Sequence, residues 1–246
     1  MKILGIIPSR YGSTRFPGKA LADIHGKPMI QRTYEQAKKC ELLHDVIVAT
    51  DHQAIFDCML PFNNNICMTS EHHQSGTDRC YEALKKQLYE YDYVINIQGD
   101  EPFINPKQIT QLATLLEGET QLATLVKPID HHEDIVNPNV VKAIFNKNNE
   151  AIYFSRNPIP FGRNYPTTDW QKHHHYYKHI GIYAYRTDIL KEITQLPPSS
   201  LEIAESLEQL RWIENNYKIK TAITEFETIG IDTPEDLEKA LKTMKE

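Results

Sequence analysis

The feature that most constrains the fold is an apolar segment at residues 3–7, which shows no alternation of apolar and polar side chains. Its apolar residues are Ile3, Leu4, Ile6 and Ile7. A strand that is apolar on both faces is typical of a parallel sheet covered by helices on both sides. We therefore expect a buried strand here. We expect Pro8 to end its ladder, because proline has no N–H to donate.

Strand and helix signals alternate through the first half of the chain. Runs of β-branched residues at 46–50 and 94–97 predict two further strands, which end at Asp51 and at Gln98. Helical patterns occur at about 29–40, 53–60 and 77–89, and after Pro106. Such alternation predicts an α/β fold with a central, mostly parallel sheet, and functional loops at the carboxyl ends of its strands.

The pattern changes at about residue 121. Strand-like segments follow without regular helices between them, at 123–126, 140–145, 151–154 and 179–185. They predict a mixed or antiparallel extension of the same sheet. Residues 157–177, which include His173, His174 and His175, are expected to form a long mobile loop or an interface segment.

The last quarter of the chain carries further helix signals. Ser199 or Ser200 is expected to cap a helix reaching about residue 216, followed by a strand near 219–223. Thr233 should cap a C-terminal helix with Pro234 in its first turn. At 246 residues, one domain is the default expectation.

The loop at residues 9–19 combines charge with small residues. It carries Arg10, Arg15 and Lys19, together with Gly12 and Gly18. Glycines let a backbone approach a ligand closely, and exposed N–H groups with cations suit a polyphosphate. The spacing fits neither the Walker loop nor the dinucleotide-binding loop. A solvated basic loop is the alternative, but three cations on a chain of net charge −6 favour a local anion site.

Charge and cysteine usage exclude other classes of protein. The negative net charge argues against general binding of nucleic acid or of a membrane surface. The four cysteines show no C-x-x-C spacing, which indicates reduced thiols rather than disulfides or a zinc site. The chain opens with a strand rather than a signal peptide and has no apolar run of membrane-spanning length. We therefore expect a cytoplasmic protein with no nucleic-acid or membrane partner.

One acidic segment is a candidate magnesium site, and a second by itself predicts little more than the start of a helix. Gln98-Gly99-Asp100-Glu101-Pro102 follows a strand, and Mg²⁺ prefers one or two carboxylates together with phosphates and water. A turn capped by Asp100 is the alternative. Asp232 lies in Gly230-Ile231-Asp232-Thr233-Pro234-Glu235-Asp236-Leu237, which by itself also describes a helix start. Neighbouring histidines, such as those at 173–175, are better explained as solvated loop residues than as metal ligands.

A third polar segment, at residues 68–79, runs Met-Thr-Ser-Glu-His-His-Gln-Ser-Gly-Thr-Asp-Arg. Its amide, hydroxyl and backbone groups suit recognition of a pyrimidine edge. Ser75 or Thr77 could equally cap the helix expected at 77–89, and both roles are compatible.

These segments, in this order, resemble the motifs of the CMP-Kdo synthetase family, the 3-deoxy-manno-octulosonate cytidylyltransferases. The matching loop is Arg10-Tyr11-Gly12-Ser13-Thr14-Arg15-Phe16-Pro17-Gly18-Lys19, and the similarity extends from Pro8 to about Leu237. Glu71–His72 departs from the aspartate expected there. The resemblance implies a single-domain, Rossmann-like nucleotidyltransferase fold over 1–246, with a CTP-binding part at 1–120 and a sugar-binding and dimerisation part at 121–230.

The resemblance also implies a reaction and a set of site residues. CTP and 3-deoxy-manno-octulosonate (Kdo) would give CMP-Kdo and pyrophosphate for lipopolysaccharide synthesis, with Mg²⁺ as cofactor and a homodimer as the working form. Lys19, Asp100 and Asp232 would be catalytic, with Asp100 and Asp232 as the metal ligands. CTP would be bound by Pro8, Ser9, Arg10, Arg15, Lys19, His73, Gln74, Ser75, Gly76, Arg79 and Gln98. Kdo would be bound by Arg156, His179, Tyr183, Glu208 and Gln209.

Two alternatives stay open at this point. One is a cytidylyltransferase for another acidic sugar, such as sialic acid or an eight-carbon amino analogue of Kdo. The other is a nucleotide-binding regulator that has lost turnover, against which the presence of both candidate metal ligands argues.

Overall fold

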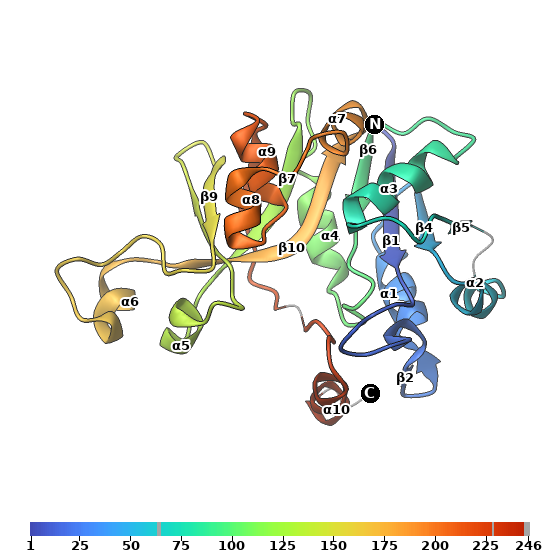
Figure 1. The fold of residues 1–246 in the computed structure, drawn as a ribbon, viewed down its shortest axis with the longest axis horizontal. Helices are drawn as coiled ribbons and strands as arrows, with labels where there is room; N and C mark the ends of the chain where they lie inside the picture. The colour runs from blue at the N-terminus through green and yellow to red at the C-terminus, as the bar shows by residue number, and fades with distance from the viewer. Residues whose placement is uncertain (63–64, 228, 244–246) are drawn as a thin grey trace.

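The computed structural model of the chain describes residues 1–62, 65–227 and 229–243. Its main sheet has the strand order β11-β7-β10-β6-β1-β4-β5, with β8 paired to β10 and β9 paired to β8 (Figure 1). The strands of this sheet are β1 (Ile3–Ser9), β4 (Asp45–Thr50), β5 (Ile66–Met68), β6 (Tyr93–Asn96), β7 (Leu122–Pro128), β8 (Lys142–Phe145), β9 (Ala151–Ser155), β10 (Tyr177–Arg186) and β11 (Ile219–Ile223). A small separate sheet pairs β2 (Asp23–Ile24) with β3 (Lys27–Pro28).

The predicted fold class is confirmed. β1 pairs in parallel with β4 and β6, and β4 pairs in parallel with β5. In the second half, β10 runs antiparallel to β6, β7 and β8, while β11 is parallel to β7. The expected extension of the sheet in the second half is therefore present and mixed.

Helices cover both faces of the sheet. They are α1 (Met29–Ala37), α2 (Gln53–Met59), α3 (Gly76–Lys85), α4 (Pro106–Ala113), α5 (His132–Val136), α6 (Trp170–His173), α7 (Thr187–Ile193), α8 (Ser200–Glu205), α9 (Gln209–Glu214) and α10 (Pro234–Thr243), with short 3₁₀ turns η1 (Lys19–Leu21) and η2 (Thr167–Asp169). Ile3 and Ile7 of β1 pack with α1, α2 and α4, whereas Leu4 and Ile6 pack with α3, α7 and α9. This alternation of one apolar strand between two cores explains its uninterrupted apolar sequence.

Two local predictions were wrong. β1 continues through Pro8 to Ser9, because the missing N–H lies on the side of β6, which ends at Asn96 opposite Ile6. The helix expected up to residue 216 is two helices, because Ser206 adopts a left-handed conformation with φ 51°. The 157–177 segment, expected to be a long mobile loop or an interface segment, includes the short elements η2 and α6, and Trp170 buries its ring against Tyr176 and Ile129. Whether it forms an interface stays a prediction.

The C-terminal helix α10 packs away from the main cores, against the segment that follows β1. Ile231 and Ala240 form a small buried cluster with Ile24 and Met29. Thr233 caps α10 by accepting a hydrogen bond from the Asp236 N–H at 3.2 Å. This packing fixes residues 230–233 beside the loop at 9–19. Among the described residues, no helix has the length and apolar character needed to cross a membrane.

Candidate active site

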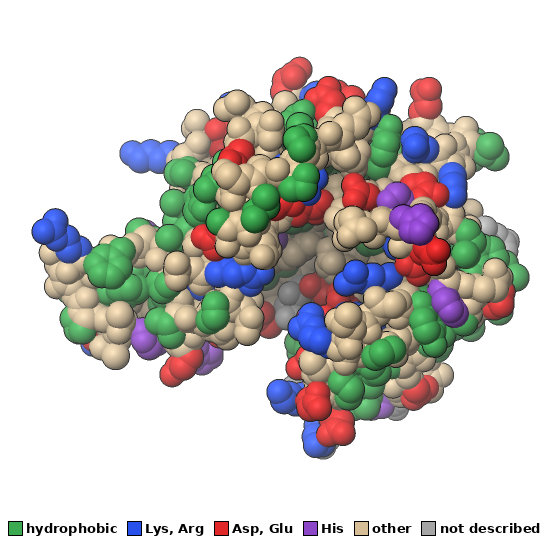
Figure 2. All heavy atoms as spheres, in the orientation of Figure 1, with side chains coloured by type: hydrophobic (Ala, Val, Ile, Leu, Met, Phe, Trp, Pro, Cys, Tyr) green, Lys and Arg blue, Asp and Glu red, His purple; other side chains and the backbone are tan. Residues whose placement is uncertain are grey.

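A cavity of about 260 Å³ opens at the carboxyl ends of β1 and β6. Figure 2 shows this face of the molecule hollowed near its centre, with acidic and basic side chains around the hollow. All of the residues expected to bind CTP line this first cavity, together with Ser13, Thr14, Ala20, Gly99, Asp100 and Asp232. The lining comes from the three segments singled out in the sequence and from the residues before α10.

Close backbone packing shapes the floor of the first cavity. A Cβ atom on Gly99 would lie 2.8 Å from the carbonyl oxygen of Pro8, so only glycine fits where the β6 loop crosses β1. Gly18 has φ 68°, which lets the 9–19 loop turn into η1 and present Lys19. Gly99 therefore allows the two backbone segments to pack closely, and Gly18 allows the turn that places Lys19 in the cavity.

Four charged side chains meet in the first cavity. The Lys19 ammonium lies 2.7 Å from an oxygen of Asp100 and 2.8 Å from an oxygen of Asp232. The Arg15 guanidinium lies 2.9 Å from the other oxygen of Asp232. Partial burial disfavours the charged forms, but the ion pairs outweigh it, so the pKa of Lys19 is raised and the pKa of Asp232 is lowered.

The donor set fits the predicted metal. Two carboxylates from distant parts of the chain converge here, and Mg²⁺ commonly takes one or two carboxylates, with phosphates and water completing its shell. Within the described ranges, no three His, Cys, Asp or Glu side chains group as a metal site.

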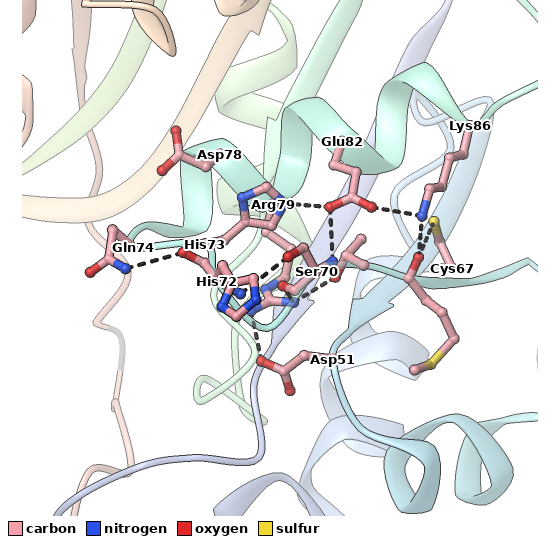
Figure 3. Close-up of polar contacts among 12 residues, drawn as sticks. Asp51, Cys67, Ser70, His72, His73, Gln74, Asp78, Arg79, Glu82 and Lys86 are labelled. Atoms are coloured by element: carbon pink, nitrogen blue, oxygen red, sulfur yellow. Dashed lines mark hydrogen bonds and ion pairs between the residues drawn. The ribbon is translucent and has the colours of Figure 1, made fainter. Parts of the chain in front are cut away.

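The 69–76 loop, which provides His73, Gln74, Ser75 and Gly76, is held by side chains of α3 (Figure 3). Glu82 accepts hydrogen bonds from the Ser70 N–H at 2.9 Å and from the His73 ring, and it pairs with Lys86 at 2.7 Å. Partial burial opposes ionisation of Glu82, but these donors outweigh it and lower its pKa to about 2. Ser75 caps α3 by accepting from the Asp78 N–H at 3.1 Å, as the sequence predicted.

Arg79 is nearly enclosed and is held by three acceptors (Figure 3). Its Nη2 lies 2.7 Å from Oδ2 of Asp51, and its Nη1 donates to the Thr69 hydroxyl at 2.5 Å and to the Ser70 carbonyl at 3.3 Å. The Asp51 side chain follows β4, at the strand end where the sequence placed it.

A second cavity of about 580 Å³ adjoins the first. His179, Tyr183, Glu208 and Gln209, four of the five residues predicted to bind the sugar, line it. The two cavities share Gly76, Gln98, Asp100 and Asp232. The predicted metal ligands therefore lie where the two cavities meet.

Buried polar groups of the second cavity are arranged by their neighbours. The Thr77 hydroxyl donates to Glu208 at 2.8 Å, and burial raises the pKa of Glu208. Burial lowers the pKa of His179 to about 3, so its ring is neutral near pH 7. The Thr124 hydroxyl lies 2.8 Å from the Ile182 carbonyl and 3.1 Å from Nε2 of His179. If the hydroxyl donates to Ile182, His179 carries its proton on Nε2.

Arg156 does not line the second cavity, so its role in binding Kdo stays a prediction. Its guanidinium donates to the backbone carbonyls of Glu205 at 2.7 Å, Pro138 at 3.0 Å and Ser206 at 3.3 Å. These bonds tie β9 to the end of α8 and occupy the planar fork that would bind a carboxylate. The cation that lines the second cavity is Lys178, among the residues the structure describes, and it pairs with Glu227 at 2.7 Å.

Sequence reasoning missed several residues of the second cavity. Asn96, Glu101, Lys178 and Glu227 line it without having been predicted. Asn96 stands in an apolar strand, where a lone amide could have been noticed. Glu101 is next to Asp100, and burial followed by the Asp100 charge raises its pKa to about 8. Lys178 and Glu227 become neighbours only through the fold.

Comparison with known proteins gives a consistent result. The cytidylyltransferase family model matches residues 4–220. The 3-deoxy-manno-octulosonate cytidylyltransferases of Parabacteroides distasonis and Bacteroides thetaiotaomicron are 60% and 56% identical, over 98% and 100% of this chain and 97% and 99% of their own lengths. A solved structure of CMP:2-keto-3-deoxy-manno-octonic acid synthetase complexed with CTP is 42% identical, with a TM-score of 0.92 over 99% of this chain and 98% of that one. With these relatives and this cavity pair, the chain belongs to the cytidylyltransferase family, in its 3-deoxy-manno-octulosonate branch.

Proposed function

We propose that this protein transfers CMP from CTP to the anomeric hydroxyl of Kdo and releases pyrophosphate. The observation that carries the proposal is the meeting of two polar cavities at Asp100 and Asp232. A nucleotide in the first cavity and a sugar in the second would bring the α-phosphorus and the attacking hydroxyl to this shared edge. Such a transfer depends on positioning and charge neutralisation rather than on a covalent intermediate with the protein.

The first cavity is proposed to bind CTP. Arg15 and Lys19 would bind the β- and γ-phosphates, and Arg10 would lie near the α-phosphate, because these three cations come from one loop that lines the first cavity. His73, Gln74 and Ser75 would face the cytosine. When phosphates enter, Lys19 and Arg15 exchange their carboxylate partners for phosphate oxygens, which leaves Asp100 and Asp232 available.

Asp100 and Asp232 are the residues that would hold Mg²⁺, which, when bound, neutralises phosphate charge and favours ionisation of an attacking hydroxyl. Lys19 is proposed to be catalytic because its ammonium lies within 2.8 Å of both carboxylates and at the shared edge of the cavities. From there it can stabilise negative charge that develops on the leaving pyrophosphate.

The second cavity is proposed to bind the sugar through His179, Tyr183, Glu208 and Gln209. The neutral ring of His179 and the fixed Glu208 carboxyl offer hydrogen bonds suited to hydroxyl groups. Residues 1–120 would thus provide most of the CTP site and residues 121–230 most of the sugar site. Asp232 completes both from outside these ranges.

The experiment offers CTP and Mg²⁺ with Kdo, sialic acid or the amino analogue of Kdo, and measures pyrophosphate release and the mass of the CMP-sugar. We expect CMP-Kdo to form fastest. Preference for another sugar would reject Kdo as substrate, and CTP binding without turnover on any sugar would favour a regulator. We also propose that the protein works as a homodimer in the cytoplasm, where CTP is made. Light scattering tests the dimer, and cell fractionation tests the compartment.

A further inference from the structure

Asp51 contacts two segments that line the first cavity but does not line it itself. Its Oδ2 lies 2.7 Å from Nη2 of Arg79, and its Oδ1 accepts the backbone N–H of Tyr11 at 3.1 Å. The Asp51 side chain is 12% exposed and that of Arg79 only 4% exposed. A charge as enclosed as that of Arg79 needs its partner, because an unpaired buried charge is costly.

On one side, Arg79 transmits the position of Asp51 to the 69–76 loop. Its Nη1 donates to the Thr69 hydroxyl and the Ser70 carbonyl, which are the first residues of that loop (Figure 3). Arg79 also lines the first cavity beside His73 and Ser75. A shift of its guanidinium would therefore move the loop proposed to recognise cytosine.

On the other side, Tyr11 transmits the position of Asp51 to the 9–19 loop. The Tyr11 carbonyl accepts the N–H groups of Ser13 at 2.9 Å and Gly18 at 3.1 Å, which closes the loop that carries Arg15. The Tyr11 ring stacks on His52 with ring centroids 3.9 Å apart. The peptide of Tyr11 is thus anchored by residues that follow β4.

We propose that Asp51 is a positioning residue that sets the separation between the loop for cytosine and the loop for the triphosphate. This inference rests on the proposed function, because it takes the first cavity as the CTP site. The Oδ1 atom of Asp51 binds the 9–19 loop and its Oδ2 atom binds Arg79, which holds the 69–76 loop. The carboxylate at the end of β4 therefore fixes the position of both loops. CTP then binds both loops at once without the cost of bringing them together.

The test uses two variants of Asp51 and one matched control. Asp51→Ala removes both contacts. Asp51→Asn keeps an oxygen that accepts the Tyr11 N–H, but it places an amide NH₂ group next to the Arg79 guanidinium. It therefore removes the contact with Arg79, which holds the 69–76 loop, and keeps the contact with the 9–19 loop. Glu82→Gln is the control, because Glu82 holds the same loop through Ser70 and His73 and, among the described residues, forms no hydrogen bond or ion pair with residues 9–19. Calorimetry measures the binding of CMP and of inorganic tripolyphosphate, each with Mg²⁺, and melting temperatures report folding.

We expect Asp51→Ala to weaken both CMP and tripolyphosphate about tenfold, the size expected when a charge-assisted hydrogen bond that orders a loop is lost. Asp51→Asn should weaken CMP and leave tripolyphosphate within about twofold of wild type, as should Glu82→Gln. A general loss of folding would weaken the binding of CMP and of tripolyphosphate together, rather than that of CMP alone.

Unchanged tripolyphosphate binding in a folded Asp51→Ala variant would overturn the inference. So would equal losses of tripolyphosphate binding in Asp51→Ala and Glu82→Gln. If Asp51→Ala does not fold, the Asn variant decides, and equal loss or no loss of both ligands there would overturn it. Wild-type protein that binds neither ligand would instead reject the proposed CTP site, and the inference with it.

Discussion

Replacing Lys19 with methionine should strengthen the binding of a divalent cation in the absence of nucleotide. In the structure, the Lys19 ammonium is the internal counter-ion of Asp100 and Asp232, at 2.7 and 2.8 Å. A cation that enters without CTP must compete with this ammonium for both carboxylates. Methionine removes the competitor and keeps a side chain of similar length.

The size of the effect follows from the two ion pairs. Unit charges 4 Å apart interact by about 4 kcal/mol at an effective dielectric constant of 20. The Asp100 and Asp232 side chains are 30% and 45% exposed, so solvent screening reduces each pair to about 1 kcal/mol. The two ion pairs of Lys19 together cost an entering cation about 2 kcal/mol of binding free energy. Removing them should raise the affinity for the cation roughly 30-fold.

The assay is the binding of Mn²⁺, followed by electron paramagnetic resonance without CTP, together with the shift of the melting temperature in Mg²⁺. Stabilisation of the folded state by a bound ion makes the second readout independent of turnover. Lys27→Met is the matched control, because Lys27 pairs with Glu35 at 2.8 Å away from both cavities. Equal or weaker Mn²⁺ binding in Lys19→Met would refute the assignment of Lys19 as counter-ion of the metal ligands.

Four further predictions follow from the same contacts. Asp100→Asn or Asp232→Asn should abolish CMP-sugar formation with little change in melting temperature; near-normal turnover in both would reject them as metal ligands. Arg15→Ala should weaken CTP binding, measured by calorimetry, far more than Kdo binding, because a cation–phosphate contact is charge-assisted. Arg156→Lys should lower the free energy of unfolding by about 1–3 kcal/mol while sparing the KM for Kdo, because lysine cannot replace the charge-assisted hydrogen bonds to the carbonyls of Glu205 and Pro138. A raised KM with unchanged stability would return Arg156 to the sugar site. The pKa of His179 is about 3 in the folded protein and about 6.5 in the unfolded chain, so the free energy of unfolding should fall as the pH drops from about 6.5 toward 3. Urea denaturation at pH 7 and pH 5 measures this fall, and His179→Gln should make it smaller by about 1–2 kcal/mol.

The sequence predicted the parts of the fold and site that depend on local pattern. The apolar segment before Pro8 predicted the parallel core. The loop ending at Lys19 was expected at a functional site, and it lines the first cavity. Ser75 and Thr233 were identified as helix caps because capping depends on a few neighbouring residues.

The parts that the sequence did not predict depend on contacts between distant residues. Arg156 has the charge that a sugar acid needs, but its use by three backbone carbonyls depends on how β9 meets α8. Ser206 breaks a helix although its local sequence is helical in pattern, and its left-handed conformation, with φ 51°, is not visible in that pattern. Lys178 and Glu227 join through the approach of β10 to the segment after β11.

The place of Asp232 in the chain has a consequence for synthesis on the ribosome. Its partner Arg15 is 217 residues earlier, and α10 must pack on Ile24 and Met29 to hold Asp232 in place. A nascent chain can therefore complete the loops that bind the nucleotide well before it acquires its second carboxylate. With Asp232 in the role proposed above, transfer would begin only after α10 has been translated and packed.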